Sequence, residues 1–241
     1  MNEPAQSSLA PKAFHGFGDP TPEPLASRLH TFRFLLIVGG IALAGLLNGR
    51  QAATSSAGSH LPLYLTIVGL QLLFVWFVRL GIRARGIQLL DLIGRRWRFP
   101  LDGLRDTALA VFFVVLLRGC FGLLQHLLGQ SSANAAFLLP NGPLESALWV
   151  AVSIVAGVGE EIVYRGYLQR QLWALCGSLP LAILLQALIF GIGHAYQGWR
   201  PALITAIYGL AFGLLAAWRK SIVPGAIAHT CVDVIGGLFP R

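Results

Sequence analysis

Seven apolar blocks dominate the sequence, and each is close to the roughly 20 residues that a helix needs to cross a bilayer. Their approximate limits are 31–48, 61–80, 105–127, 144–172, 178–196, 201–218 and 221–239. The gaps between the blocks are short, so they leave no room for a soluble domain of ordinary size. We therefore expect an all-α fold, a polytopic transmembrane helical bundle with about seven spans.

Composition supports a membrane protein and argues against other classes. Only 12% of the residues are charged and 55% are hydrophobic, whereas a soluble domain is about 25% charged. The net charge is +8, but the basic residues are spread between apolar blocks and form no phosphate-binding face, so we expect no nucleic-acid partner. Three cysteines, Cys120, Cys176 and Cys231, lie in apolar stretches without CxxC spacing. They are expected to be small core residues, outside any disulfide framework or zinc ribbon.

The positions of Lys and Arg predict the orientation. The gap between the second and third blocks is rich in arginine and should face the cytoplasm. Alternation from there places the N-terminus in the cytoplasm and gives three regions. These are a disordered cytoplasmic tail (1–30), three N-terminal spans with a basic loop (31–143) and a C-terminal core (144–241). Within the loop, residues 86–99 are either an amphipathic segment on the inner leaflet or an ordinary loop.

Seven ionisable residues fall inside apolar blocks, where a charge costs at least about 2.5–3.5 kcal/mol and therefore marks a candidate functional site. They are Arg118, Glu160, Glu161, Arg165, His194, His229 and Asp233. Glu161 and Arg165 are spaced i, i+4, which suits an ion pair on one helical face. Glu160 is rotated by about 100° from Glu161, so it can point elsewhere and act as a general acid or base. The alternative is a structural polar network that joins helices.

Two histidines extend this candidate site. A lone His194 on an apolar helix is more often a structural hydrogen-bonding residue, but His229 has Asp233 at i+4 on the same face. Two histidines and several carboxylates on separate helices can bind a divalent metal or activate a water directly. Arg118 is expected to neutralise one of the carboxylates.

Three motifs resemble those of the CPBP family of intramembrane proteases, which includes the CAAX prenyl endopeptidases and is also called the Abi family. The EExxxR motif is matched by Glu160, Glu161 and Arg165, and the FxxxH motif by Phe190 and His194. The third motif, a histidine helix ending in HxxxN, is matched at His229 but has Asp233 in place of Asn. The resemblance covers about residues 144–238.

The resemblance implies a bacterial inner-membrane endopeptidase with its active site between the last four helices. Glu160 would be the general base, activating a water held with His194, while Arg165 orients Glu161. His229 and residue 233 would stabilise the oxyanion. Because an ionised Asp233 would repel that oxygen, it must be protonated, pair with Arg118 or His229, or bind a metal.

The family is described both as metal-dependent and as metal-independent. A divalent metal such as zinc, held by Glu160, His194 and His229, is therefore left open, and no other cofactor is expected. The implied partners are the lipid bilayer and a membrane-embedded or membrane-proximal peptide or protein substrate. Two other functions are compatible with the sequence. One is a non-proteolytic bacteriocin-immunity or scaffold protein, and the other is a transporter with a proton relay, although no internal repeat supports a transporter.

Overall fold

The computed structural model describes residues 22–52, 59–128 and 136–239, and helices make up most of this part of the chain. The α-helices are α1 (Arg28–Ala52), α2 (Leu61–Arg83), α3 (Pro100–Leu128), α4 (Gly142–Glu160), α5 (Arg170–Cys176), α6 (Leu179–Gly193), α7 (Trp199–Arg219) and α8 (Val223–Leu238). A π-helix, η4 (Glu161–Gln169), joins α4 to α5. The 3₁₀ turns are η1 (Leu89–Ile93), η3 (Ala136–Leu138) and η5 (Ala195–Gln197).

The predicted transmembrane helical bundle is confirmed. The segments α4, η4 and α5 run on as one helical stretch of 35 residues, so the helices correspond one to one with the seven apolar blocks. Five of the described segments are long and apolar enough to cross a membrane. α6 and α8, with 15 and 16 residues, are apolar but shorter than the roughly 20 residues of a full span. The number of complete spans therefore stays a prediction.

Local sequence signals explain where several helices begin and end. α2, α4, α6 and α8 each carry a proline in the first turn, where its missing N–H costs no hydrogen bond. The Ser178 hydroxyl also accepts a hydrogen bond from the Leu181 amide at the start of α6. α5 ends at Gly177, whose φ of 69° lies in the left-handed region that favours glycine.

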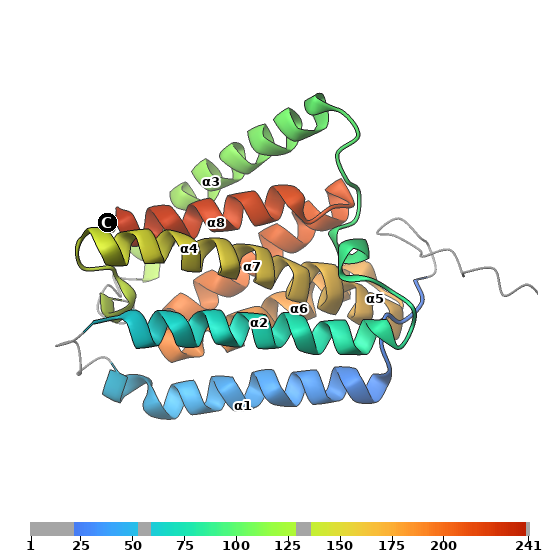
Figure 1. Ribbon diagram of the computed structural model, residues 1–241, viewed down its shortest axis with the longest axis horizontal. Helices are drawn as coiled ribbons and strands as arrows, with labels where there is room; N and C mark the ends of the chain where they lie inside the picture. Colours follow the sequence, from blue (N-terminus) through green and yellow to red (C-terminus); the bar gives the residue numbers. More distant parts are fainter. Residues whose placement is uncertain (1–21, 53–58, 129–135, 240–241) are drawn as a thin grey trace, which may run out of the picture.

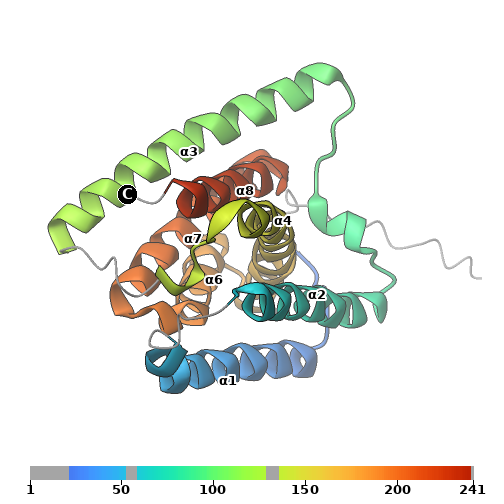
Figure 2. The ribbon, with the colours of Figure 1, turned by 60° about the vertical axis from the view of Figure 1, so that its left-hand side comes forward.

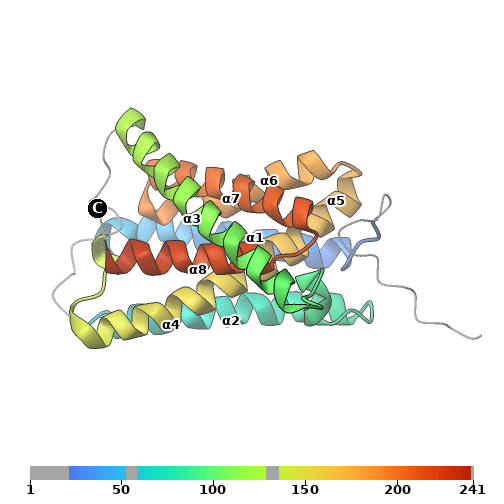
Figure 3. The same ribbon diagram turned by 90° about the horizontal axis from the view of Figure 1, so that it is seen from above.

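The helices run along the long axis of the molecule, except α3, which lies obliquely across the outer side of α8 (Figures 1 and 3). α8 also packs against α4, and α6 packs against α7 (Figure 2). One hydrophobic core joins α1, α2 and α6 to the π-helix, and a smaller one joins α3, α7 and α8. The charged residues of the candidate site lie between these two cores.

Segments predicted to face the cytoplasm meet at one end of the bundle (Figure 1). The Arg95 amide donates to the Lys220 carbonyl at 2.7 Å, which joins the loop after α2 to the turn between α7 and α8. Asp106 at the start of α3 accepts from Arg219 at 2.6 Å. This basic end therefore agrees with the alternation deduced from the arginines, while the side of the membrane that it faces stays a prediction.

Parts of the loop and of the tail pack against the bundle. Leu92 of η1 is fully buried in the core around the π-helix, whereas Leu90, Trp97 and Phe99 are more than half exposed. An amphipathic segment on the inner leaflet therefore stays a prediction. Residues 1–21 of the predicted tail lie outside the described residues. Its packed part begins before the predicted boundary at residue 30, because Leu25 and Ala26 are buried and Gln171 hydrogen-bonds to the Ala26 backbone.

The three cysteines, all within the described residues, are free. Cys120 and Cys231 are partly buried. Cys176 is exposed at the end of α5, so it differs from the predicted core residue.

Candidate active site

Glu160 is the last residue of α4, and its carboxylate contacts two other helices. Its Oε1 accepts a hydrogen bond of 2.6 Å from the Gln71 amide of α2. Its Oε2 lies 3.6 Å from His229 Nε2 of α8. The side chain is about 10% exposed. A carboxylate held by one oxygen, with no hydrogen-bond donor on the other in the described structure, can accept a proton, as a general base must.

Glu161 and Arg165 form the predicted ion pair, and both side chains are fully buried. Arg165 Nη1 donates to Glu161 Oε1 at 2.7 Å, and Arg165 Nη2 donates to the Gly209 carbonyl of α7. The guanidinium carbon lies 4.4 Å from the centroid of the Phe190 ring of α6, a distance that allows a cation–π interaction. The pair therefore links the π-helix to α6 and α7.

The two glutamates lie at the change from α-helix to π-helix. Glu160 ends α4 and Glu161 begins η4. A π-helix has hydrogen bonds from i to i+5, and such segments occur frequently at functional sites. The sequence predicts an ordinary helical face for Glu161 and Arg165. In the structure they lie in the π-helix and still pair, while Glu160, at the end of α4, contacts α2 and α8.

His229 is the centre of the cluster. Its ring stacks on Phe212 with a centroid separation of 5.1 Å. Its Nδ1 lies 3.2 Å from Glu161 Oε1, and because a carboxylate only accepts, Nδ1 is the donor. Its Nε2 faces Glu160 Oε2 at 3.6 Å and Asp233 Oδ2 at 3.8 Å. One imidazole therefore contacts three carboxylates.

Asp233 is the most open member of the cluster, with a side chain 32% exposed. Its backbone carbonyl accepts a hydrogen bond of 2.9 Å from the Trp149 indole of α4. Of the partners that the sequence leaves open for Asp233, the structure places His229 beside it. Among the ion pairs of the described residues, none within 4.0 Å includes Arg118.

His194 follows the last residue of α6 and does not lie inside a helix. Its Nδ1 lies 2.9 Å from the Phe190 carbonyl, which can only accept, so Nδ1 donates and Nε2 keeps its lone pair. The Phe190 ring lies between the two histidines, with centroids 4.8 Å from His194 and 5.9 Å from His229. His194 therefore borders the cluster, and within the described residues it bonds to none of the three carboxylates.

Glycines allow α8 to approach the glutamates. A Cβ at Gly157 of α4 would meet the Thr230 backbone nitrogen at 2.7 Å, and a Cβ at Gly225 would lie 2.9 Å from Glu161 Oε2. Real Cβ atoms essentially never show such distances. The absence of a side chain at the two glycines therefore lets α8 lie close enough for His229 to contact both glutamates.

Two residues of the site, Gln71 and Trp149, are absent from the sequence-based set. That set was limited to ionisable residues in apolar blocks, and neither side chain is ionisable. A polar Gln71 inside the second apolar block was the available signal, because a buried amide needs a hydrogen-bonding partner. Trp149 carries no comparable signal in the sequence.

The described side chains of the site are not grouped as metal ligands. Within the described residues, no group of three or more His, Cys, Asp and Glu side chains is placed to hold a metal ion. His229 Nδ1 faces Glu161, and Glu160 Oε1 accepts from Gln71. No chemical step is therefore assigned to a metal, and the metal site through Glu160, His194 and His229 stays a prediction.

Comparison with known proteins identifies the segment that contains this cluster. Residues 142–235, from α4 to α8, match the family model described as type II CAAX prenyl endopeptidase Rce1-like. This segment is Rce1-like. The match agrees with the CPBP motifs at Glu160, Phe190 and His229. No curated protein matches the chain, and no solved structure matches it.

The Rce1-like match indicates the general class of protein in which this cluster occurs. The family is one of membrane proteases, which act on peptide substrates, and the apolar helices agree with an integral membrane protein. The Rce1-like segment supplies Glu160, Glu161, Arg165, His194, His229 and Asp233. Gln71 lies outside it, on α2, so the N-terminal helices also contribute to the site.

Proposed function

We propose that the protein is an intramembrane endopeptidase that hydrolyses a peptide bond with a water activated by Glu160. The observation that supports this proposal most directly is the position of the Glu160 carboxylate. Gln71 holds one carboxylate oxygen at 2.6 Å and the other faces His229 at 3.6 Å. A positioned base of this kind accelerates a reaction by about 10²–10⁴-fold.

In the proposed reaction, Glu160 takes a proton from the water while the water oxygen forms a bond to the peptide carbonyl carbon. His194 Nε2 accepts a hydrogen bond from the second water hydrogen, which stays on the oxygen, because His194 Nδ1 is already bonded to the Phe190 carbonyl. The C–N bond of the tetrahedral intermediate then breaks. Glu160 returns its proton to the leaving amine, which yields one carboxylic acid and one amine, and the acid then loses its proton to water.

His229 is the proposed donor to the oxyanion. Glu161 accepts from Nδ1 and orients the ring, while Nε2 points to the space between Glu160 and Asp233. A protonated Nε2 donates to the developing oxyanion, and one such donor contributes about 2.7–4 kcal/mol. Arg165 holds Glu161 in place through the 2.7 Å ion pair. Asp233, in place of the family's asparagine, orients Nε2 instead of donating to the oxyanion.

The proposed substrate is a membrane-embedded or membrane-proximal peptide. The family description names prenylated CAAX ends as the substrates of the matched family. The cluster lies between apolar helices whose outer faces are largely exposed leucine and phenylalanine. These outer faces favour a hydrophobic substrate that approaches through the bilayer.

The test uses the purified full-length chain in detergent with three probes. These are a farnesylated peptide with a CAAX end, the same peptide without the prenyl group, and an apolar helical peptide. In H₂¹⁸O, we expect cleavage with one ¹⁸O atom in the new carboxylate of at least one probe. A non-proteolytic immunity or scaffold protein would leave all three intact, and that result would contradict the proposal.

A further inference from the structure

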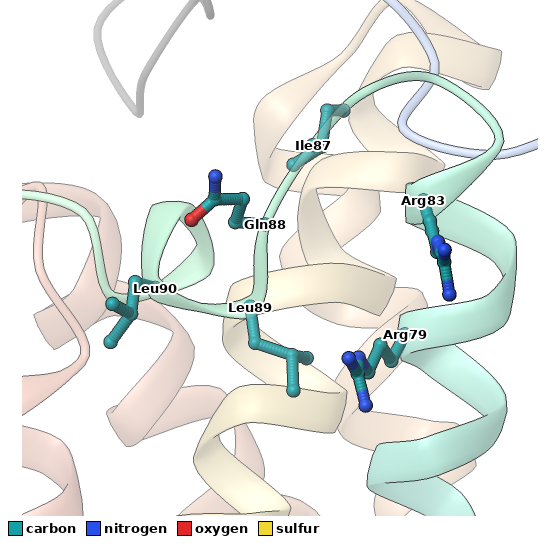
Figure 4. Close-up of a pocket in the computed structure, with 6 residues that line it drawn as sticks. All are labelled: Arg79, Arg83, Ile87, Gln88, Leu89 and Leu90. Atoms are coloured by element: carbon teal, nitrogen blue, oxygen red, sulfur yellow. The ribbon is translucent and has the colours of Figure 1, made fainter.

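A groove at the basic end of the bundle lies apart from the catalytic cluster. Figure 4 shows Arg79 and Arg83 of α2 on one side, with Leu89 facing them from the chain that follows. The volume of the groove is about 400 Å³, and its lining is completed by Ile87, Gln88 and Leu90. The groove therefore combines two guanidinium groups with aliphatic side chains.

Both arginines are exposed, and no acidic residue in the described ranges pairs with them. In the described part of the chain, no carboxylate lies within 4.0 Å of either guanidinium. The acidic residue that follows the groove, Asp91, faces Arg96 at 3.6 Å instead. Two neighbouring unpaired guanidinium groups favour an anionic ligand, and their planar N–H donors suit phosphate oxygens.

An apolar stripe leads along α2 to these arginines. Leu72, Trp76, Arg79 and Arg83 follow the spacing i, i+4, i+7 and i+11, which places them on one face of the helix. Leu72 is 59% exposed and Trp76 is 53% exposed. Tryptophan is enriched where a membrane protein crosses from the apolar core to the headgroups. The order along the stripe is therefore apolar, interfacial and cationic, which complements the acyl chain and the anionic phosphate of a phospholipid.

We propose that this groove binds one anionic phospholipid. Its phosphate lies between Arg79 and Arg83, and an acyl chain follows Leu72 and Trp76 along α2. Gln88 provides an amide that can hydrogen-bond the headgroup. Leu89 packs against the core that includes the π-helix, so the bound lipid also supports the segment that carries Arg165.

The test measures lipid binding to the full chain in detergent by native mass spectrometry. We expect one phosphatidylglycerol per chain, bound about tenfold more tightly than phosphatidylcholine. The double variant R79Q/R83Q should lose this preference. The matched variant R85Q/R98Q should keep it, because it removes two exposed arginines of the same basic segment that do not line the groove.

Three results would overturn the proposal. An equal loss in R79Q/R83Q and R85Q/R98Q would show a general charge effect. Full retention in R79Q/R83Q would place the lipid elsewhere. Displacement of phosphatidylglycerol by an equal concentration of glycerol phosphate would show a phosphate site with no role for the acyl chain.

Discussion

Glu160 and Glu161 are neighbours in the sequence but have different surroundings in the structure. Glu161 is fully buried and bonds to Arg165, whereas Glu160 is slightly exposed and bonds to Gln71. The i, i+4 spacing predicts the first contact, because it depends only on local helix geometry. The Gln71 contact joins residues 89 positions apart, so no local pattern indicates it.

The hydrogen bond from Gln71 should matter for turnover. Gln71→Met keeps the length of the side chain but removes the amide that holds Glu160. A hydrogen bond to a charged group contributes about 1.5–3 kcal/mol, so we expect kcat to fall about 10- to 100-fold with little change in KM. Thr66→Val on the same helix is the control, since Thr66 bonds only to the Pro62 carbonyl. An unchanged kcat in Gln71→Met would remove its positioning role.

The buried ion pair should matter for stability. Arg165→Met leaves Glu161 buried without its 2.7 Å partner, which typically costs about 3–5 kcal/mol. We expect lower stability to thermal unfolding in detergent, and partial recovery when Glu161→Gln removes the unpaired charge. Arg85→Gln, an exposed arginine, serves as the control. Equal stability of Arg165→Met and the wild type would contradict this account.

At the scale of elements, the packing of α4 on α8 brings the cluster together. The apolar blocks predict both helices, and the three motifs predict that their polar residues meet. The sequence does not predict the π-helix, because the change from i+4 to i+5 hydrogen bonds has no simple signature in residue type. The observed position of His194 also differs from the predicted one. The sequence places it inside a helix, whereas α6 ends one residue earlier.

Two adjacent glycines of α8 provide a matched test of this packing. A Cβ at Gly237 would overlap the Trp149 ring, whereas a Cβ at Gly236 would meet nothing within 4 Å. Gly237→Ala should therefore displace Trp149 from the Asp233 carbonyl and cost about 1–3 kcal/mol. Gly236→Ala should be neutral or stabilising by up to about 1 kcal/mol. Thermal unfolding and turnover of both variants check this difference, and equal effects would contradict it.

At the scale of the whole molecule, the sequence predicts the bundle well because the bilayer limits the choice of fold. An apolar block of about 20 residues crosses a bilayer as a helix, because a helix satisfies its own backbone hydrogen bonds. The arginine-rich gaps indicate which helix ends lie on the same side of the membrane. How far the short helices α6 and α8 extend through a bilayer depends on packing against their neighbours, which the length of an apolar block does not reveal.

The orientation of the bundle can be measured with a natural cysteine. Cys176 is exposed at the end of α5, the basic end of the molecule. After replacement of Cys120 and Cys231 by alanine, a membrane-impermeant maleimide should label Cys176 in inverted inner-membrane vesicles but not in intact spheroplasts. This result is expected because basic segments remain in the cytoplasm. Labelling in intact spheroplasts alone would reverse the orientation.

The most direct test of the central claim compares two carboxylates of the same helix. Glu160→Gln removes the proposed base but can still accept the Gln71 hydrogen bond, whereas Glu145→Gln changes the carboxylate that binds His60 at the other end of α4. With a peptide that the wild type cleaves, we expect kcat to fall about 10²–10⁴-fold in Glu160→Gln and to remain close to the wild-type value in Glu145→Gln. Wild-type turnover in Glu160→Gln would contradict hydrolysis by a glutamate-activated water.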